Sequence, residues 1–141
     1  MSQNNNDKKP KFNLEAIKKD FDGDFEKILT MENNDNVSAL VSKIEEFVKN
    51  RFFDGAKEYI STHQLRNIYD KVLKCNENNI QLIRPKLAYV AARQQKAEAK
   101  ELVKFFNELI KDIENSPSKL ESFKIFFEAI VAYHKFYSPK K

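Results

Sequence analysis

The chain has 141 residues, and its 25 Lys and Arg against 21 Asp and Glu give a formal charge of +4. This length suits one domain with a single core and excludes two comfortable ones. Two glycines, four prolines and one cysteine leave little material for hairpins and exclude an internal disulfide, and no apolar run is long enough to span a bilayer. With no leader at its start, the sequence predicts an intracellular, cytoplasmic protein that makes no membrane contact.

The positive charge is concentrated in the middle of the chain. Residues 57–93 hold seven Lys or Arg against three Asp or Glu, and all four arginines lie between residues 51 and 93. The planar guanidinium of Arg donates in pairs, which suits phosphate better than the Lys ammonium does. Such a patch favours nucleic acid weakly, and a solvated face explains it equally well.

The N-terminal part predicts a tail and one short helix. Residues 1–12 are polar and show no periodicity, so we expect a disordered tail. Leu14, Ile17 and Phe21 follow helical spacing, which breaks near Gly23. Residues 31–36, MENNDN, predict a loop.

Two amphipathic helices follow. The first begins at Val37, with one apolar stripe made of Val37, Leu40, Val41, Ile44, Val48 and Phe52. The segment DGAK interrupts it. Ser61 and Gln64 then fit a capping box that opens a second helix. The residues that this helix is expected to bury are Leu65, Ile68, Tyr69, Val72 and Leu73.

The segment IRPKLAYVAAR, residues 83–93, predicts a helix with an unusual start. Pro85 suits the first helical position, and Arg84 before it is expected to be extended at the mouth of the helix. Arg84 and Lys86 are cations at the end of a helix that favours negative charge, where each base costs about 0.3–1 kcal/mol. An anion from outside the chain would compensate for them.

The C-terminal part predicts two long helices. Residues 97–113 carry the stripe Leu102, Val103, Phe105, Phe106, Leu109, Ile110 and Ile113. The last helix runs from Ser116 or Ser118 to about Tyr137, is apolar on two faces, and is expected at the centre of the fold. Since no strand-like alternation appears, we predict an all-α compact bundle of five to six helices over residues 13–137, with a tail at 138–141.

The sequence offers few parts for chemistry. His63 lies beside a helix cap, His134 on an apolar helix face and Cys75 at a helix end, so each has a structural explanation. The acids of DFDGDFE lack the glycine position of a calcium loop of the EF-hand kind, and no zinc spacing or phosphate-binding glycine loop is present. We predict no catalytic residue, no metal and no cofactor.

Within residues 83–93, three side chains share one helical face. At 100° per residue, Lys86 and Arg93 fall about 20° apart with Tyr89 about 60° away. Leu87, Ala88 and Ala91 lie opposite and would let a neighbouring helix approach closely. A phosphate contact is one interpretation of the cationic face. The other is an ordinary solvated face with Tyr89 tucked into the core.

Three sequence blocks resemble a known family. HQLRNIYDKV, LIRPKLAYVAAR and FKIFFEAIVAYHKF, read in this order and at this separation, are similar to the small subunit of the type III-A CRISPR–Cas effector, the Csm complex. The resemblance covers about residues 60–137, and residues 1–55 carry little of it.

The resemblance implies an all-α small subunit without nuclease activity. Copies of such a subunit stack head to tail along the inner face of the complex, beside the backbone subunits that hold the guide RNA. They line the groove in which target RNA pairs with the guide. Cleavage of target RNA belongs to the backbone subunit, while DNA cleavage and cyclic oligoadenylate synthesis belong to the large subunit. Contact with RNA would then rest on shape and backbone charge, because base pairing already recognises the sequence.

The resemblance also implies which cations face RNA: Arg66, Lys71, Arg84, Lys86 and Arg93. From the residues alone, an ion pair with Asp70 four positions along explains Arg66 more simply. The expected partners are guide RNA, target RNA, other Csm subunits and further copies of the chain. The competing hypothesis is a helical protein–protein adaptor whose basic patch meets an acidic partner and never touches nucleic acid.

Overall fold

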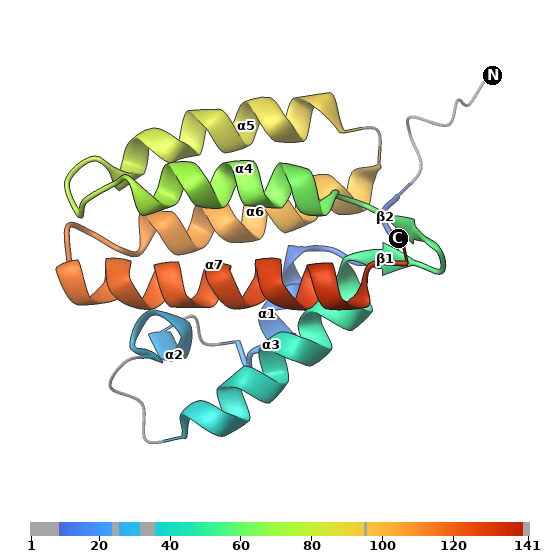
Figure 1. Ribbon diagram of the computed structural model, residues 1–141, viewed down its shortest axis with the longest axis horizontal. Coiled ribbons are helices and arrows are strands. Elements are labelled where there is room, and N and C mark those ends of the chain that lie inside the picture. Colours follow the sequence, from blue (N-terminus) through green and yellow to red (C-terminus); the bar gives the residue numbers. More distant parts are fainter. Residues whose placement is uncertain (1–8, 24–25, 32–35, 95, 140–141) are drawn as a thin grey trace.

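In a computed structural model, the protein is described over residues 9–23, 26–31, 36–94 and 96–139, and these residues are mostly helical (Figure 1). The helices and strands, in chain order, are α1 (Leu14–Asp20), α2 (Glu26–Leu29), α3 (Val37–Arg51), β1 (Phe53–Asp54), β2 (Lys57–Glu58), α4 (Thr62–Leu73), the 3₁₀ turn η3 (Ile80–Leu82), α5 (Ile83–Arg93), α6 (Ala97–Lys111) and α7 (Pro117–Tyr137). The predicted all-α fold is confirmed.

Polar side chains cap the helices where the sequence placed them. Ser61 accepts a hydrogen bond from the Gln64 amide at 3.0 Å, and Gln64 Oε1 accepts one from the Ser61 amide at 3.1 Å, so the predicted capping box is present. Ser116 caps α7, whose first residue is Pro117. These contacts satisfy amide donors that the first turn of a helix leaves unpaired.

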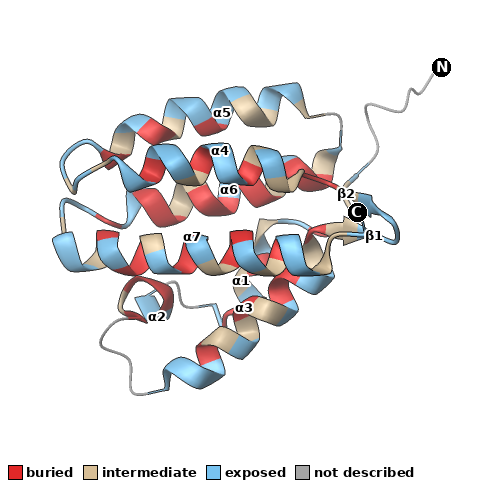
Figure 2. Ribbon diagram, viewed as in Figure 1, coloured by how far each residue is buried: buried red, intermediate tan, exposed pale blue. Residues whose placement is uncertain are grey.

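The core is a cluster of aromatic rings contributed by α1, α3, α6 and α7. Phe21 and Phe105 are stacked at 5.7 Å between ring centroids, and Phe47 meets both rings edge-on at 5.2 and 5.3 Å. Phe126 of α7 closes this cluster at 5.9 Å from Phe105. The whole predicted stripe of α6 is buried, and so are Ile17 and Phe21 of the predicted first helix (Figure 2).

Helix α7 differs from the prediction, because its second apolar face is not covered. Phe123, Phe127 and Ile130 are buried, but Ile125 is exposed and Phe136 retains 75% of its accessible surface. The helix packs against α2, α3 and α4 on one side only. The wheel cannot distinguish a central helix from one whose second apolar face is left to solvent.

A small antiparallel hairpin was not predicted. Phe53 pairs with Glu58 and Asp54 with Lys57 across a two-residue turn, within the segment DGAK. Gly55 has a φ of 63°, the left-handed conformation that such tight turns require and that glycine adopts without strain. Strands of two residues are too short to show alternation, so the sequence gives only the glycine as a signal.

The two predicted tails lie largely outside the described residues. The last residue of the N-terminal one, Phe12, is buried and meets the ring of Tyr59 edge-on at 6.1 Å. Nearby, the Lys11 ammonium lies 3.0 Å from Asp54 of the hairpin. The loop expected at residues 31–36 also lies mostly outside the described residues. In the part of the chain that is described, none of the helices is both long enough and apolar enough to cross a membrane.

His134 links the C-terminal end of α7 to the hairpin and to the start of α4. Its side chain is fully buried, as predicted for a core histidine. Nδ1 lies 2.7 Å from the Thr62 hydroxyl, and Nε2 lies 3.7 Å from the Glu58 carboxylate, to which Ser138 also donates. Burial lowers the pKa of His134 below its ordinary 6.5, although Glu58 opposes this shift.

The lowered pKa of His134 predicts a loss of stability in mild acid. Below pH 6.5 the unfolded chain takes up a proton at this position more readily than the folded chain does. The free energy of unfolding should therefore be fully retained above pH 6.5 and fall as the pH drops below it, by at most about 1.4 kcal/mol per pH unit. Urea titrations between pH 7.5 and 5 would measure this fall, with the pH values chosen to stay above most carboxylate titrations.

Two variants separate the effect of His134 from other groups. His134→Gln should lower stability at neutral pH but flatten the slope between pH 6.5 and 5. His63→Gln, which changes an exposed histidine, should keep the wild-type slope. An unchanged slope in His134→Gln would show that another group is responsible.

Candidate nucleic-acid interface

Helix α5 begins earlier than the sequence predicted. It starts at Ile83, directly after the 3₁₀ turn η3, so Pro85 is its third residue and not its first. Arg84 is therefore helical, which corrects the expected extended conformation. Ile80 and Ile83 are both buried, and their packing draws the turn into the helix. Pro85 is tolerated because the first turn has amides without intrahelical partners in any case.

The predicted face of α5 is open to solvent. Lys86, Tyr89 and Arg93, here named the α5 strip, are all exposed, and Tyr89 retains 65% of its surface. The Arg93 guanidinium lies over the Tyr89 ring, 5.6 Å from its centroid. The alternative in which Tyr89 tucks into the core is therefore wrong. Within the described residues, neither Lys86 nor Arg93 has a carboxylate within 4.0 Å.

Arg84 does not belong to the α5 strip. At 100° per residue it lies about 160° from Lys86 around the helix. Its Nε donates to Asn107 Oδ1 at 3.2 Å and its Nη1 donates to Gln81 Oε1 at 3.3 Å. Gln81 in turn donates to the Ile110 carbonyl of α6 at 2.8 Å. These neutral oxygens from the chain itself compensate part of the charge at the start of α5.

A groove of about 460 Å³ runs between α5 and α6 on the flank of Arg84. Its floor includes Leu87 and Val103, and its sides include Ala88 and Ala91. The small side chains were expected to let a neighbouring helix approach closely. Instead Leu87 alone is buried against α6, while the alanines are too short to fill the space beside it.

Two lysines of α6 stand at this groove and were missed by the sequence analysis. Lys100 and Lys104 line it together with Arg84, and Lys104 also pairs with Glu101 at 2.9 Å. The signal was present in their i, i+4 spacing on the polar side of the α6 stripe. It pointed only to a solvated face until the position of α5 was known.

The two predicted cations of α4 lie on different flanks of that helix. Tyr69 stacks on Phe127 of α7 at 6.1 Å, and Arg66 lies about 60° from Tyr69 on the wheel, on the side of α7. Lys71 lies about 160° from Tyr69, on the side of α5, which is the next helix across the view in Figure 1. Both side chains are exposed. Among the described residues, no ion pair joins Arg66 to Asp70, so the simpler explanation of Arg66 is wrong.

The end of α4 lies within electrostatic reach of the α5 strip. The Cys75 thiol donates to the Lys71 carbonyl at 3.4 Å, and burial raises the pKa of this thiol. The positive charges of Lys124 and Lys86 oppose that rise. Lys86 therefore approaches the segment that follows α4, on the flank that also carries Lys71. The structure brings Lys71, Lys86 and Arg93 toward one surface and leaves Arg66 and Arg84 on others.

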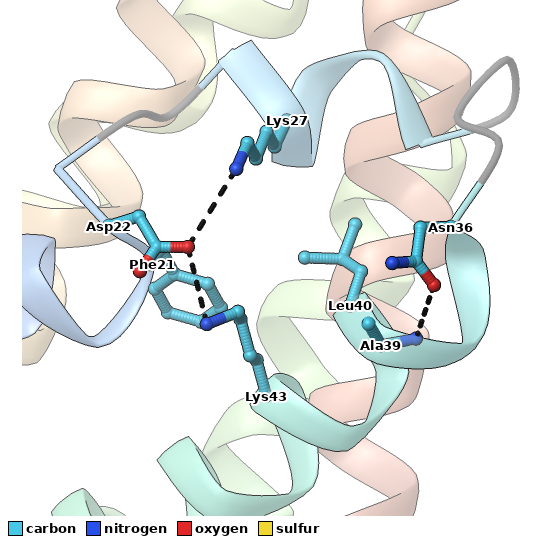
Figure 3. A pocket seen from close by; sticks show the side chains of 7 residues that line it. All are labelled: Phe21, Asp22, Lys27, Asn36, Ala39, Leu40 and Lys43. Atoms are coloured by element: carbon cyan, nitrogen blue, oxygen red, sulfur yellow. Dashed lines mark hydrogen bonds and ion pairs between the residues drawn. The ribbon is translucent and has the colours of Figure 1, made fainter.

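A separate hollow of about 240 Å³ lies where α1, α2 and α3 meet (Figure 3). Asp22, with a left-handed φ of 61°, lies 3.2 Å from the Lys43 ammonium and 3.7 Å from the Lys27 ammonium. Both lysines lower the pKa of Asp22, Lys43 the more strongly. Because one carboxylate holds both cations, this hollow offers less free positive charge than the α5 strip.

The different surroundings of Arg84 and Lys86 predict different effects on stability. Arg84→Ala should lower the free energy of unfolding by about 1 kcal/mol, because two hydrogen bonds are lost and Asn107 and Gln81 keep unpaired oxygens. Lys86→Ala should change it by less than about 0.5 kcal/mol. Urea denaturation of both variants at one pH would measure the difference. Equal losses would mean that the hydrogen bonds of Arg84 do not contribute to stability.

Comparison with known proteins supplies the family. A scan of family models matches residues 34–140 to Csm2 Type III-A, a range that includes residues 34–59, where the motifs carried little signal. Comparisons with curated proteins and with solved structures gave no match. The resemblance of the three sequence blocks is thus confirmed over most of the chain. The chain belongs to the Csm2 family, the small subunits of the type III-A Csm complex.

Proposed function

We propose that this chain is a non-catalytic subunit that stacks along the inner filament of the Csm complex and contacts the backbone of guide and target RNA. The observation that carries the proposal is the α5 strip. Residues 78–97 contain four Lys or Arg and no Asp or Glu, so the strip presents positive charge that no acid on this helix neutralises. Phosphate is the anion that such a surface meets in an RNA-guided complex.

Contact with the phosphate backbone fits the way these cations are held. Lys86, Arg93 and Lys71 are exposed and free to follow a flexible strand, whereas base pairing within the complex supplies the sequence recognition. Arg84, with Lys100 and Lys104 in the α5–α6 groove, and Arg66 on the other flank of α4 are proposed as further contacts. A few cations neutralise few phosphates, so we expect weak binding by the isolated chain and strong binding only in the complex.

The proposal assigns no reaction and no cofactor to this chain. His134 is buried in the structural contact with Thr62, His63 lies 3.4 Å from the Asn67 amide, and Cys75 is held by a backbone carbonyl. Each of these groups has a structural explanation, which supports a non-catalytic role. The cytoplasm, where the complex meets RNA, is the proposed location.

One observation favours a second candidate function. The α5–α6 groove has an apolar floor, which is typical of a surface that receives another protein, so a helical adaptor that binds no nucleic acid stays a candidate. Native mass spectrometry of the tagged protein from its own host, with and without ribonuclease, separates the two. Several copies together with other Csm subunits and a guide RNA support the subunit. A set of partners without RNA or Cas proteins supports the adaptor.

The proposed RNA contact predicts the behaviour of a triple variant. Replacing Arg84, Lys86 and Arg93 together by Ala should weaken binding of target RNA by the assembled complex. Because each lost phosphate contact releases fewer counterions, the slope of log affinity against log salt should fall by about one per contact. Electrophoretic or filter-binding titrations at several salt concentrations would measure both quantities.

The matched control replaces three exposed lysines elsewhere, Lys19, Lys57 and Lys135, by Ala. It changes the net charge by the same amount and should leave the affinity and the salt slope nearly unchanged. Equal losses in both variants would indicate an effect of total charge. Unchanged RNA affinity in the Arg84, Lys86 and Arg93 variant would contradict the proposed contact.

A further inference from the structure

Tyr89 is a large side chain that folding does not use. It lies in the middle of α5 with 65% of its surface exposed, and the preceding turn exposes Leu82 on the same side, at 67%. Exposed apolar groups are common one at a time, but here an aromatic ring stands between two cations on one helix face. Core packing therefore gives no reason for tyrosine at this position.

The charges around Tyr89 are also uncompensated. Arg93 lies over one part of the ring, 5.6 Å from its centroid, as a cation–π pair. Lys86 is three residues away on the other side, and helical geometry separates Lys86 from Arg93 by roughly 10 Å along the axis. In the described part of the chain, the Tyr89 hydroxyl makes no hydrogen bond and neither cation has an acidic partner. The ring and both cations are thus available to a ligand.

A planar ring flanked by two cations matches the chemistry of a nucleotide. A base stacks on an aromatic face with a gain of about 1–3 kcal/mol, and every base has such a face, so this contact needs no particular sequence. The phosphates on either side of the base would meet Lys86 and Arg93. A base inside a regular duplex is already stacked on both faces, so the ring selects an unpaired base.

We propose that Tyr89 is a stacking platform for an unpaired RNA base whose flanking phosphates are held by Lys86 and Arg93. The proposal rests on the RNA contact proposed above and deepens it, because it adds a base to a surface otherwise credited with charge alone. Tyr and Arg are also frequent anchors between proteins. The lack of any acid over residues 78–97 favours the polyanion, since protein surfaces present both signs of charge.

The sequence itself provides a clean reporter. The chain contains no tryptophan, so Tyr89→Trp in the full-length protein places a single indole on the strip. Titration at low salt with single-stranded oligouridylate should quench its fluorescence, because the base stacks on the indole. Inorganic polyphosphate of equal charge should bind without quenching. Polyglutamate is the probe for an acidic protein partner.

Affinity measurements on three further variants complete the test. Tyr89→Ala should weaken oligouridylate binding about tenfold, and Tyr89→Phe, which keeps the ring, should bind like wild type. Phe136→Ala is the matched control, since it removes an equally exposed aromatic ring from α7 and should change nothing. Binding of polyphosphate should be the same in all of these proteins.

Each outcome bears on the proposal. Quenching by RNA alone, with the loss confined to Tyr89→Ala, supports it. Equal RNA affinity of Tyr89→Ala and wild type, or equal quenching by polyphosphate, overturns the stacking platform and leaves the charge contact intact. Loss of polyglutamate binding in Tyr89→Ala without loss of RNA binding assigns the ring to a protein partner and also overturns it. If the assembled complex keeps its RNA affinity without Arg84, Lys86 and Arg93, the proposed function itself fails, a result distinct from failure of Tyr89.

Discussion

The packing of Phe21, Phe47, Phe105 and Phe126 is the interaction on which the rest of the structure depends. These rings come from four helices far apart in the sequence, and each is buried to within about one per cent of its surface. Burial of each such side chain contributes roughly 1.5–3 kcal/mol, and edge-on pairs add about 0.5–1.5 kcal/mol. Helices α1, α3, α6 and α7 are thereby fixed around one centre. Helix α5 contributes no ring to it.

This arrangement explains why function is expected on α5. Helix α5 is attached through Ile83 and Leu87 and through the hydrogen bonds of Gln81 and Arg84 to α6, so most of its surface remains free. Charged and aromatic side chains can stand there without disturbing the core. The same attachment is narrow, which leaves the groove beside the alanines. The free face and the groove therefore have one structural origin.

Most of the fold could be predicted from the sequence because it depends on local patterns. The stripe of α6 and the capping box at Ser61 are visible in a single helix and were confirmed. What depended on neighbouring helices could not be predicted: whether the second face of α7 was covered, and which flank of α4 carried Lys71. The hairpin at Gly55 was missed because two residues per strand carry no period.

The candidate site shows the same division. The common face of Lys86, Tyr89 and Arg93 follows from helical geometry alone and is present. Arg84 was grouped with them because a helix was assumed to start at Pro85, whereas the buried Ile80 moves the start back and turns Arg84 toward Asn107. The cation at the helix mouth thus has an internal partner. The two cations without one, Lys86 and Arg93, stand beside the exposed ring, so the search for an external anion belongs on that face of α5 and not at its N-terminus.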